Sequence, residues 1–237
     1  MLSGTIINVL TVLVGGSLGR FLGNRLPERV QTTIFDGLGL ITLLVGIQQA
    51  LGTANVLILL GSTLLGGLIG EALRIESRIE RFGDWVQGKL TKDSASRFSE
   101  AFVTSSLLFC VGPLTITGSL ENGLVGNYRP LALKAMLDGF ASFAFAASLG
   151  WGVLASTLTI LVFQGGLSLG AGLFAGILDA AVIRELTAAG GLLIMGIGIQ
   201  LLRLKWIAVA NFLPSLLIAP LLVLLLRELA PLLPTLP

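Results

Sequence analysis

Eight segments of this chain are each apolar over about 20 residues, which is the length that an α-helix needs to cross a lipid bilayer. They lie at residues 5–22, 32–51, 55–73, 98–120, 131–149, 153–176, 187–204 and 208–226. Only 12% of the residues are charged, against about 25% in soluble domains, so we expect an all-α, polytopic transmembrane helix bundle. The last two segments are joined by only a few residues around Lys205, which leaves a seven-span alternative with the C-terminus on the other face.

The longest polar stretch, residues 74–97, separates the third segment from the fourth. Its apolar residues recur every three or four positions and so share one helical face, while charged residues occupy the other. This pattern indicates an amphipathic helix in the membrane interface, with Trp85 at the level of the lipid headgroups. Docking of a partner protein is the alternative interpretation.

Basic residues are distributed unevenly among the connections between segments. The regions 20–29 and 74–97 together carry nine of the 15 Lys and Arg residues, and the connection after the second segment carries none. Because Lys and Arg are enriched in cytoplasmic loops, we expect both regions in the cytoplasm of a bacterial inner-membrane protein, with the N-terminus outside.

The fourth segment carries Gly112-Pro113 in its middle, and this pair predicts a broken helix. Pro113 has no N–H to donate to the carbonyl four residues earlier, and its ring clashes with that carbonyl. In hydrocarbon such a break persists only where it is buried in protein or lines a polar cavity. Polar side chains follow the break and, with the freed carbonyls, form a candidate ion or substrate site: Thr115, Thr117, Ser119 and Glu121. The alternative is a kink healed by a neighbouring helix, with the hydroxyls bonded to their own helix.

Two short motifs repeat at the same offset of 102 residues: Gly16-Ser17-Leu18 recurs as Gly118-Ser119-Leu120, and Asp36-Gly37 recurs as Asp138-Gly139. Three segments separate the copies, and an odd number inverts the second copy in the membrane. Inverted repeats with discontinuous helices are a recurring architecture of secondary transporters. We therefore expect one transmembrane domain over residues 1–237, with repeats at about 5–73 and 98–176, a cytoplasmic linker at 74–97 and a C-terminal helical hairpin at 187–226.

A weaker repeat joins Gly39-Leu40 and Gly46-Ile47-Gln48 to Gly191-Leu192 and Gly198-Ile199-Gln200, at an offset of 152. Glycines spaced every four residues, as at positions 15, 19 and 23, allow helix backbones to approach closely. We interpret these glycine faces as packing surfaces within the chain or as the interface of a homodimer.

Asp36 and Asp138 are the strongest candidates for coupling residues. Each lies several residues inside its apolar segment, where a carboxylate costs roughly 2.5–3.5 kcal/mol. A carboxylate near a helix N-terminus, favoured by the helix dipole, is the structural alternative. For Asp138 a second alternative is neutralisation by Lys134, four residues earlier on the same helical face.

Uncharged polar residues also occur inside the apolar segments, and most such residues join helices through hydrogen bonds. Gln164 most resembles a binding residue, because Gly165 and Gly166 expose backbone beside its amide. The others are Gln48, Gln200 and Asn211.

Several classes of function are excluded or disfavoured. The chain has no histidine and one cysteine, Cys110, so histidine catalysis, an intrachain disulfide and a cysteine metal cluster are excluded, and we expect no metal or cofactor. The excess of basic residues follows membrane sidedness and indicates no nucleic acid. Paired aspartates occur in membrane proteases, but neither Asp36 nor Asp138 lies in their Gly-x-Gly-Asp pattern, so we expect no enzyme.

Motifs along nearly the whole chain resemble the uncharacterised bacterial membrane family that includes YqgA and YdfK. They are Phe109-Cys110-Val111-Gly112-Pro113, Gly118-Ser119-Leu120, Leu137-Asp138-Gly139-Phe140, Gln164-Gly165-Gly166, Ala189-Gly190-Gly191-Leu192 and Asn211-Phe212-Leu213-Pro214. The resemblance implies an integral inner-membrane protein and a membrane transporter as one suggested role. It brings no substrate and no functional residues.

The expected function is secondary transport of an ion or small solute. The broken helix would cross its counterpart near Gly15-Gly16 at the bilayer midplane, and Asp36 and Asp138 would couple transport to Na+ or protons. A structural or assembly protein of the membrane and a channel are the alternatives.

Overall fold

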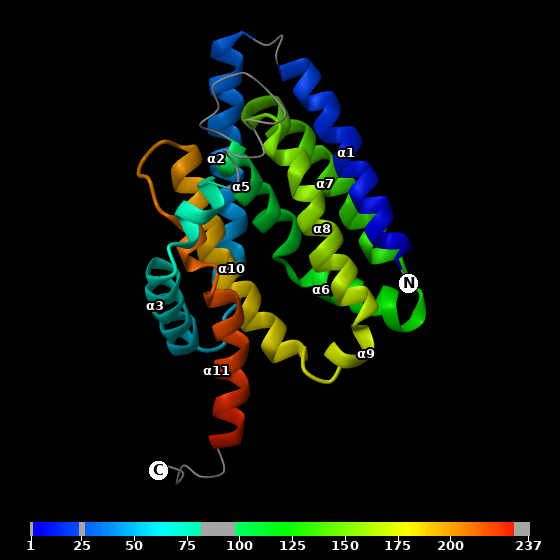
Figure 1. The fold of residues 1–237 in the computed structure, drawn as a ribbon, viewed down its shortest axis with the longest axis vertical. Helices are drawn as coiled ribbons and strands as arrows, with labels where there is room; N and C mark the ends of the chain where they lie inside the picture. Colours follow the sequence, from blue (N-terminus) through cyan, green and yellow to red (C-terminus); the bar gives the residue numbers. More distant parts are fainter. Residues whose placement is uncertain (1, 24–26, 82–97, 230–237) are drawn as a thin grey trace.

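The computed structural model describes residues 2–23, 27–81 and 98–229 of the chain. All regular structure in these residues is helical, as the sequence predicts. The elements in chain order are α1 (Ser3–Gly23), α2 (Glu28–Ala50), α3 (Val56–Ala72), α5 (Phe98–Cys110), α6 (Pro113–Val125), α7 (Arg129–Leu149), α8 (Gly152–Leu169), α9 (Ala171–Phe174), α10 (Ala180–Leu201), η1 (Val209–Phe212) and α11 (Ser215–Leu229) (Figure 1). A short helix, Ile75–Arg81, follows α3.

Within the described ranges, six helical segments are long and apolar enough to cross a membrane, and the number rises to eight if each of two bent pairs is one span. One pair is α5 and α6, which meet at 60°. This is the predicted break of the fourth segment: α5 ends at Cys110, and Pro113 begins α6, where its missing N–H would have no partner in any case. The other pair is α3 and Ile75–Arg81, which meet at 54° where Arg74 adopts a left-handed φ of 51°.

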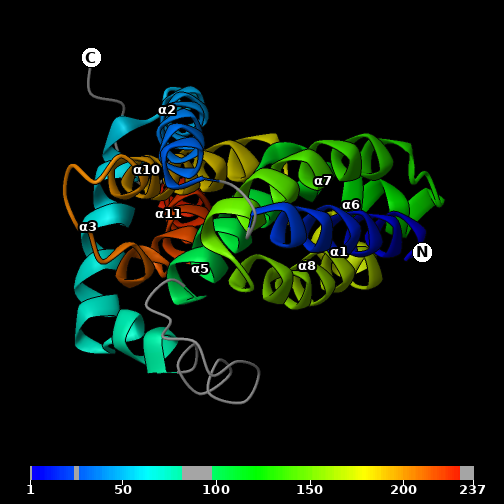
Figure 2. The same cartoon turned by 90° about the horizontal axis from the view of Figure 1, so that it is seen from above.

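Helices α1 and α7 run parallel and in close contact, as Figures 1 and 2 show. A Cβ atom on Gly15 would lie 2.3 Å from the carbonyl oxygen of Gly139, and the same holds one and two turns later along both helices. Those contacts are 2.1 Å from Gly19 to Phe143 and 2.2 Å from Gly23 to Ala147. Only glycine permits this approach, so the glycine face of α1 is a packing surface within the chain.

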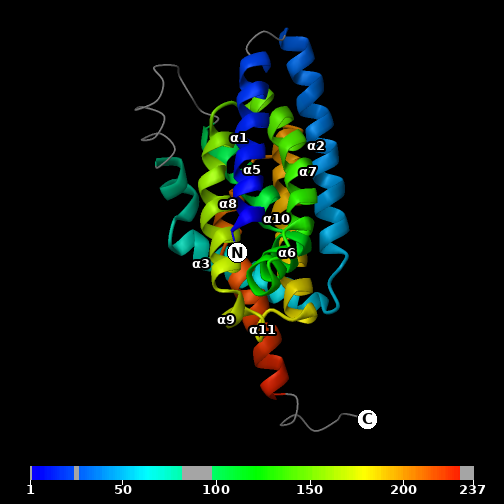
Figure 3. The ribbon, with the colours of Figure 1, turned by 90° about the vertical axis from the view of Figure 1, so that its right-hand side faces the viewer.

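Helices α2 and α10 are joined in the same way, but antiparallel. A Cβ atom on Gly46 would lie 2.6 Å from the Met195 nitrogen, and one on Gly191 would lie 2.5 Å from the Ala50 nitrogen. The motifs that recur at an offset of 152 residues therefore contain the glycines by which the two helices pack against each other. In Figure 3 α2 lies at the outer edge of the bundle, and α10 is the most buried span.

One expectation about α1 is wrong. The sequence suggested that the broken helix has its counterpart near Gly15-Gly16, but α1 is continuous through both residues. The physical reason is helix packing: Gly15 lies against α7 and Gly16 against Leu154 of α8, so these glycines remove side-chain bulk from a regular helix and do not interrupt it.

Two boundaries also differ from the prediction. Helix α10 begins at Ala180, seven residues before the predicted span, because Asp179 accepts hydrogen bonds from the backbone of Ala181 and Val182, both at 3.0 Å. Of the region predicted to form an amphipathic helix, the structure describes the helix Ile75–Arg81, and Trp85 with the rest of the predicted interfacial face lies outside the described residues.

Candidate functional site

A buried ion pair lies on α7, in the middle of the bundle. Lys134 Nζ contacts Asp138 Oδ2, and the two side chains are only 8% and 10% exposed. Residues four positions apart lie one above the other on a helix, which brings the opposite charges together. The pairing of these two residues that the sequence allowed is therefore present in the structure.

Amide side chains from two other helices extend this pair into a network. Asn8 of α1 donates from Nδ2 to Asp138 Oδ2 at 2.9 Å and to Gln164 Oε1 of α8 at 3.0 Å. Gln164 in turn donates from Nε2 to the Thr5 hydroxyl at 3.4 Å. Asn8, Thr5 and Gln164 are fully buried. Three spanning helices therefore meet at one polar centre in an apolar bundle.

The close packing of α1 on α7 holds this centre together. Next to Asp138, a Cβ atom on Gly139 would lie 2.5 Å from the Thr11 side chain, so α1 can come close enough for Asn8 to reach the carboxylate only because residue 139 is glycine. One turn on, the Ser142 hydroxyl donates to the Val12 carbonyl at 3.2 Å and joins the same two helices.

One acceptor in the network lacks a partner. Asn8 Oδ1 is buried and accepts no hydrogen bond from the described protein groups. Its Nδ2 is already bound to two acceptors, so the orientation of the amide leaves the oxygen available. Carboxylate and amide oxygens are the ligands that hard cations prefer. Within the described ranges no group of three or more His, Cys, Asp and Glu side chains could hold a metal ion.

The polar residues after the helix break are arranged differently from the prediction of a ligand cluster. The Thr115 hydroxyl donates to the Phe109 carbonyl at 3.3 Å, across the break, and the Ser119 hydroxyl donates to the Thr115 carbonyl at 2.5 Å. Both therefore bond to backbone carbonyls of the broken helix itself, which is the alternative that the sequence left open. Thr117 and Glu121 are exposed, and Glu121 accepts a hydrogen bond from Asn127 at 2.9 Å.

The break itself lies close to the ion pair. Cys110, at its start, is buried and within electrostatic reach of both Lys134 and Asp138. On the side of α10, Gly190 makes room for Val111, because a Cβ atom on residue 190 would overlap the Val111 side chain at 1.9 Å. The break is thus buried in protein, as hydrocarbon requires.

Asp36 does not join this centre. It is exposed on α2, and the space beside Gly37 is open, with no atom within 4 Å of a Cβ placed there. Helix α2 faces α10 with other residues, Gly39 and Gly46 among them. Of the predicted site residues, the structure brings Asp138 and Gln164 together through Asn8 and places Asp36 elsewhere.

Two buried polar residues, Glu185 and Asn8, were not identified from the sequence as members of hydrogen-bonded centres. Glu185 of α10 is 3% exposed and accepts hydrogen bonds from the Thr53 hydroxyl at 2.6 Å and the Ala54 backbone at 2.7 Å, so it holds the connection between α2 and α3. Asn8 is the one amide side chain in the apolar segment 5–22, and that was a usable signal. Asn211 behaves as the predicted interhelical link and bonds to Glu71 at 2.7 Å.

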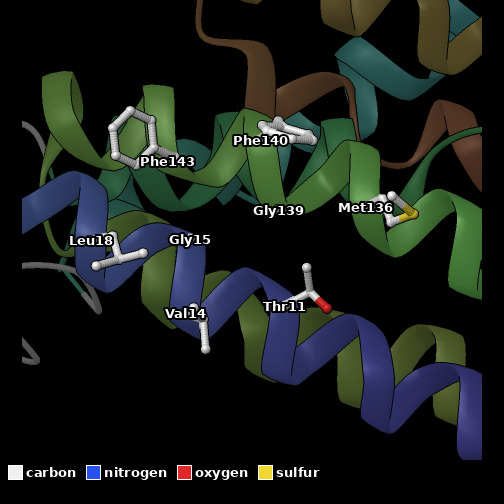
Figure 4. Close-up of a pocket in the computed structure, with 8 residues that line it drawn as sticks. All are labelled: Thr11, Val14, Gly15, Leu18, Met136, Gly139, Phe140 and Phe143. Atoms are coloured by element: carbon white, nitrogen blue, oxygen red, sulfur yellow. The ribbon is translucent and has the colours of Figure 1, made fainter.

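A groove on the outside of the bundle borders the same helices. It has a volume of about 440 Å³ and is lined by residues of α1 and α7, Gly15 and Gly139 among them (Figure 4). Figure 4 shows that the other lining residues are apolar apart from Thr11, with Phe140 and Phe143 on the α7 side. A larger apolar groove of about 930 Å³ lies between α8 and α11. Both are suited to lipid chains and neither is lined by the ion pair.

Comparison with known proteins identifies the family. The profile described as "Protein of unknown function (DUF554)" matches residues 3–224. The chain is 31% identical to the "Uncharacterized membrane protein YdfK" of Bacillus subtilis over 92% of its length and 93% of the relative. It is 32% identical to the "Uncharacterized protein YqgA" of Escherichia coli over 92% of its length and 95% of the relative. No solved structure matches. This chain, an integral membrane protein with multiple spans, belongs to the DUF554 family.

Proposed function

We propose that this protein is a secondary transporter of an ion or small solute in the bacterial inner membrane, with Asp138 as its coupling carboxylate. One observation carries the proposal: a buried Lys134–Asp138 pair, bound by the amide of Asn8, lies beside a break in a membrane-spanning helix. Charged side chains inside a membrane are costly, and they mark ion pathways and proton relays more often than structural contacts.

The arrangement of the spans supports the proposal. A parallel α1–α7 pair and an antiparallel α2–α10 pair are compatible with eight alternating spans, in which α2 and α7 run in opposite directions as an inverted repeat requires. In this topology the basic regions 20–29 and 74–97 lie on one face of the membrane, which we assign to the cytoplasm. The N-terminus is then outside.

Thermal unfolding of the purified protein across a panel of cations and small metabolites tests this function. A ligand at 100 times its dissociation constant stabilises the folded state by about 2.7 kcal/mol. We expect at least one such ligand for the wild type and none for Asp138→Asn. Glu185→Gln is the matched control, because Glu185 is also a buried carboxylate and lies outside the network.

Flux of the stabilising ligand into proteoliposomes completes the test. We expect flux with the wild type and with Asp36→Asn, and background flux with Asp138→Asn. Equal flux with and without the Asp138 carboxylate would rule out the assigned coupling role.

A structural or assembly role is the competing function, and one observation favours it. Asp36 and Gln48 are exposed on α2, the least buried of the six single-helix spans, where a lipid contact is unfavourable for both side chains. A partner chain would cover them. Purification in mild detergent distinguishes the roles, because an assembly protein retains a stoichiometric partner, which Asp36→Ala should release.

A further inference from the structure

We propose that the buried centre exchanges a monovalent cation for a proton, with Asp138 binding the cation and Lys134 releasing the proton. The inference rests on the proposed function, since both place coupling at Asp138. It goes further by naming the ligand class, the proton carrier and the stoichiometry of one to one.

The charge balance of the centre is the first step of the argument. Among the described residues, Lys134 is the charged side chain that forms an ion pair with Asp138, and the pair is neutral. Helices α1 and α8 present uncharged Asn8, Thr5 and Gln164 to it, and α5 presents the thiol of Cys110. Among the described residues no third charge compensates either member of the pair.

A cation that joined this neutral pair would leave one uncompensated positive charge in a low-dielectric interior, which is strongly unfavourable. The balance is restored if Lys134 loses a proton as the cation binds, because the ammonium becomes a neutral amine and the centre remains neutral. Lys134 is the member of the ion pair that carries its proton on a nitrogen, so it is the group that supplies the proton in this exchange. The released proton goes to water, and the reverse step takes it back.

Oxygen atoms for the cation surround the amide of Asn8. Asn8 Nδ2 lies between Asp138 Oδ2 and Gln164 Oε1, at 2.9 and 3.0 Å, and the fully buried Asn8 Oδ1 has no partner among the described groups. A half-turn of this amide exchanges Nδ2 and Oδ1, and the proposed site then has three oxygens directed at one place. Together with the Asp138 carboxylate these are oxygen ligands from three helices, and Na+, Li+ and K+ are bound by oxygen. The unpartnered amide oxygen is the observation that points to a ligand beyond the ion pair.

The test counts protons. Isothermal titration of the purified full-length protein with NaCl, LiCl or KCl, at one pH in two buffers of different ionisation enthalpy, measures the protons released for each cation bound. We expect about one, and we expect the apparent affinity to rise about tenfold for each unit of pH over the working range. Binding without proton release, or with no dependence on pH, would overturn the inference.

Variants of Lys134 sharpen the test. Lys134→Arg keeps the charge but cannot release a proton, so cation binding should fall at least tenfold. Lys134→Gln should bind the cation with no proton release and no dependence on pH. Lys205→Gln, an exposed lysine, is the control and should release one proton as the wild type does. If Lys134→Gln does not fold, the wild-type proton count and Lys134→Arg still decide the question.

Different experimental outcomes would reject the cation–proton exchange alone or reject it together with the coupling role of Asp138. If the wild type binds none of these cations but Asp138→Asn abolishes transport of another solute, the exchange is wrong and the coupling role of Asp138 stands. If Asp138→Asn binds cations and releases one proton like the wild type, both are wrong.

Discussion

Asp36-Gly37 and Asp138-Gly139 are the same dipeptide in two spanning helices, and the bundle gives them opposite surroundings. Asp138 is buried and bound by Lys134 and Asn8, and Gly139 fits against Thr11. Asp36 is exposed, and nothing lies within 4 Å of the place where a Gly37 Cβ would be. The difference comes from the neighbours: α1 covers α7 along its length, whereas α2 is covered mainly by α10 along another face.

This comparison teaches that a carboxylate in an apolar segment is not by itself a site. Its role depends on whether another helix supplies partners at the same depth. For Asp138 this partner is Asn8 of α1, which is 130 residues away in the sequence and also binds Gln164 of α8.

The largest expected effect is on the free energy of unfolding, and it distinguishes the buried Asp138 from the exposed Asp36. Lys134→Met leaves Asp138 buried without its partner, and we expect a loss of about 3–5 kcal/mol in the free energy of unfolding, measured by denaturant titration in detergent. Asp36→Asn should change it by less than about 0.5 kcal/mol. The double variant Lys134→Met, Asp138→Leu should recover most of the loss, because no unpaired charge remains. Equal losses at Lys134 and Asp36 would contradict the comparison.

The next effect concerns the amide that binds the buried carboxylate. Asn8→Ala removes hydrogen bonds to Asp138 and Gln164, and we expect it to cost about 1.5–3 kcal/mol on the same measurement. Asn127→Ala is the control, since Asn127 also donates to a carboxylate, Glu121, but at the exposed surface. It should cost less than about 0.5 kcal/mol. A loss at Asn127 as large as that at Asn8 would show that burial is not the cause.

The glycines that follow the two aspartates give a third test. Gly139→Ala places a methyl group 2.5 Å from the Thr11 side chain, and we expect a net loss of about 1–2 kcal/mol. Gly37→Ala meets open space and should be neutral or stabilise the helix by up to about 1 kcal/mol. Stabilisation by both substitutions would show that α1 and α7 are not in this close contact.

The smallest effect concerns the ion pair of Asp179 and Arg227 outside the bundle core. Comparison with the Lys134–Asp138 pair shows how much burial increases the contribution of an ion pair to stability. Arg227 Nη1 lies 2.5 Å from Asp179 Oδ2, with both side chains more than 40% exposed. The hydrogen bond from Arg227, with a further one from the Val182 backbone, lowers the pKa of Asp179 to about 2. Because this pKa is below the unfolded value, the contribution is present above about pH 4 and is lost as the pH falls toward about 2.

We therefore expect Asp179→Asn to lower stability slightly at pH 7 and to match the wild type only at or below about pH 2, in unfolding measured from pH 7 down to that value. The loss at pH 7 should be the smallest of the four, since exposed ion pairs are screened by water and salt. A difference that widens as the pH falls would mean that Asp179 is not the group responsible.

Much of the fold was predictable because its signals are local. Hydropathy located the spans, since a helix in hydrocarbon must be apolar over a fixed length. Gly112-Pro113 located the break, since a missing N–H and a steric clash act on neighbouring residues alone. The start of α10 was missed because Arg184 and Glu185 made its first turns look too polar for a span, and Glu185 is buried only through its bonds to Thr53 and Ala54.

The sequence by itself determined that this chain is a helical membrane protein, where its fourth segment breaks and which residues are too polar for lipid. Only the tertiary structure decided which of those residues meet. Glycines bring the backbones of α1 and α7 together, and this contact brings Asn8 to Asp138, links Gln164 to the pair through Asn8, and excludes Asp36. Contacts between distant segments depend on packing over the whole bundle, and no local pattern encodes them.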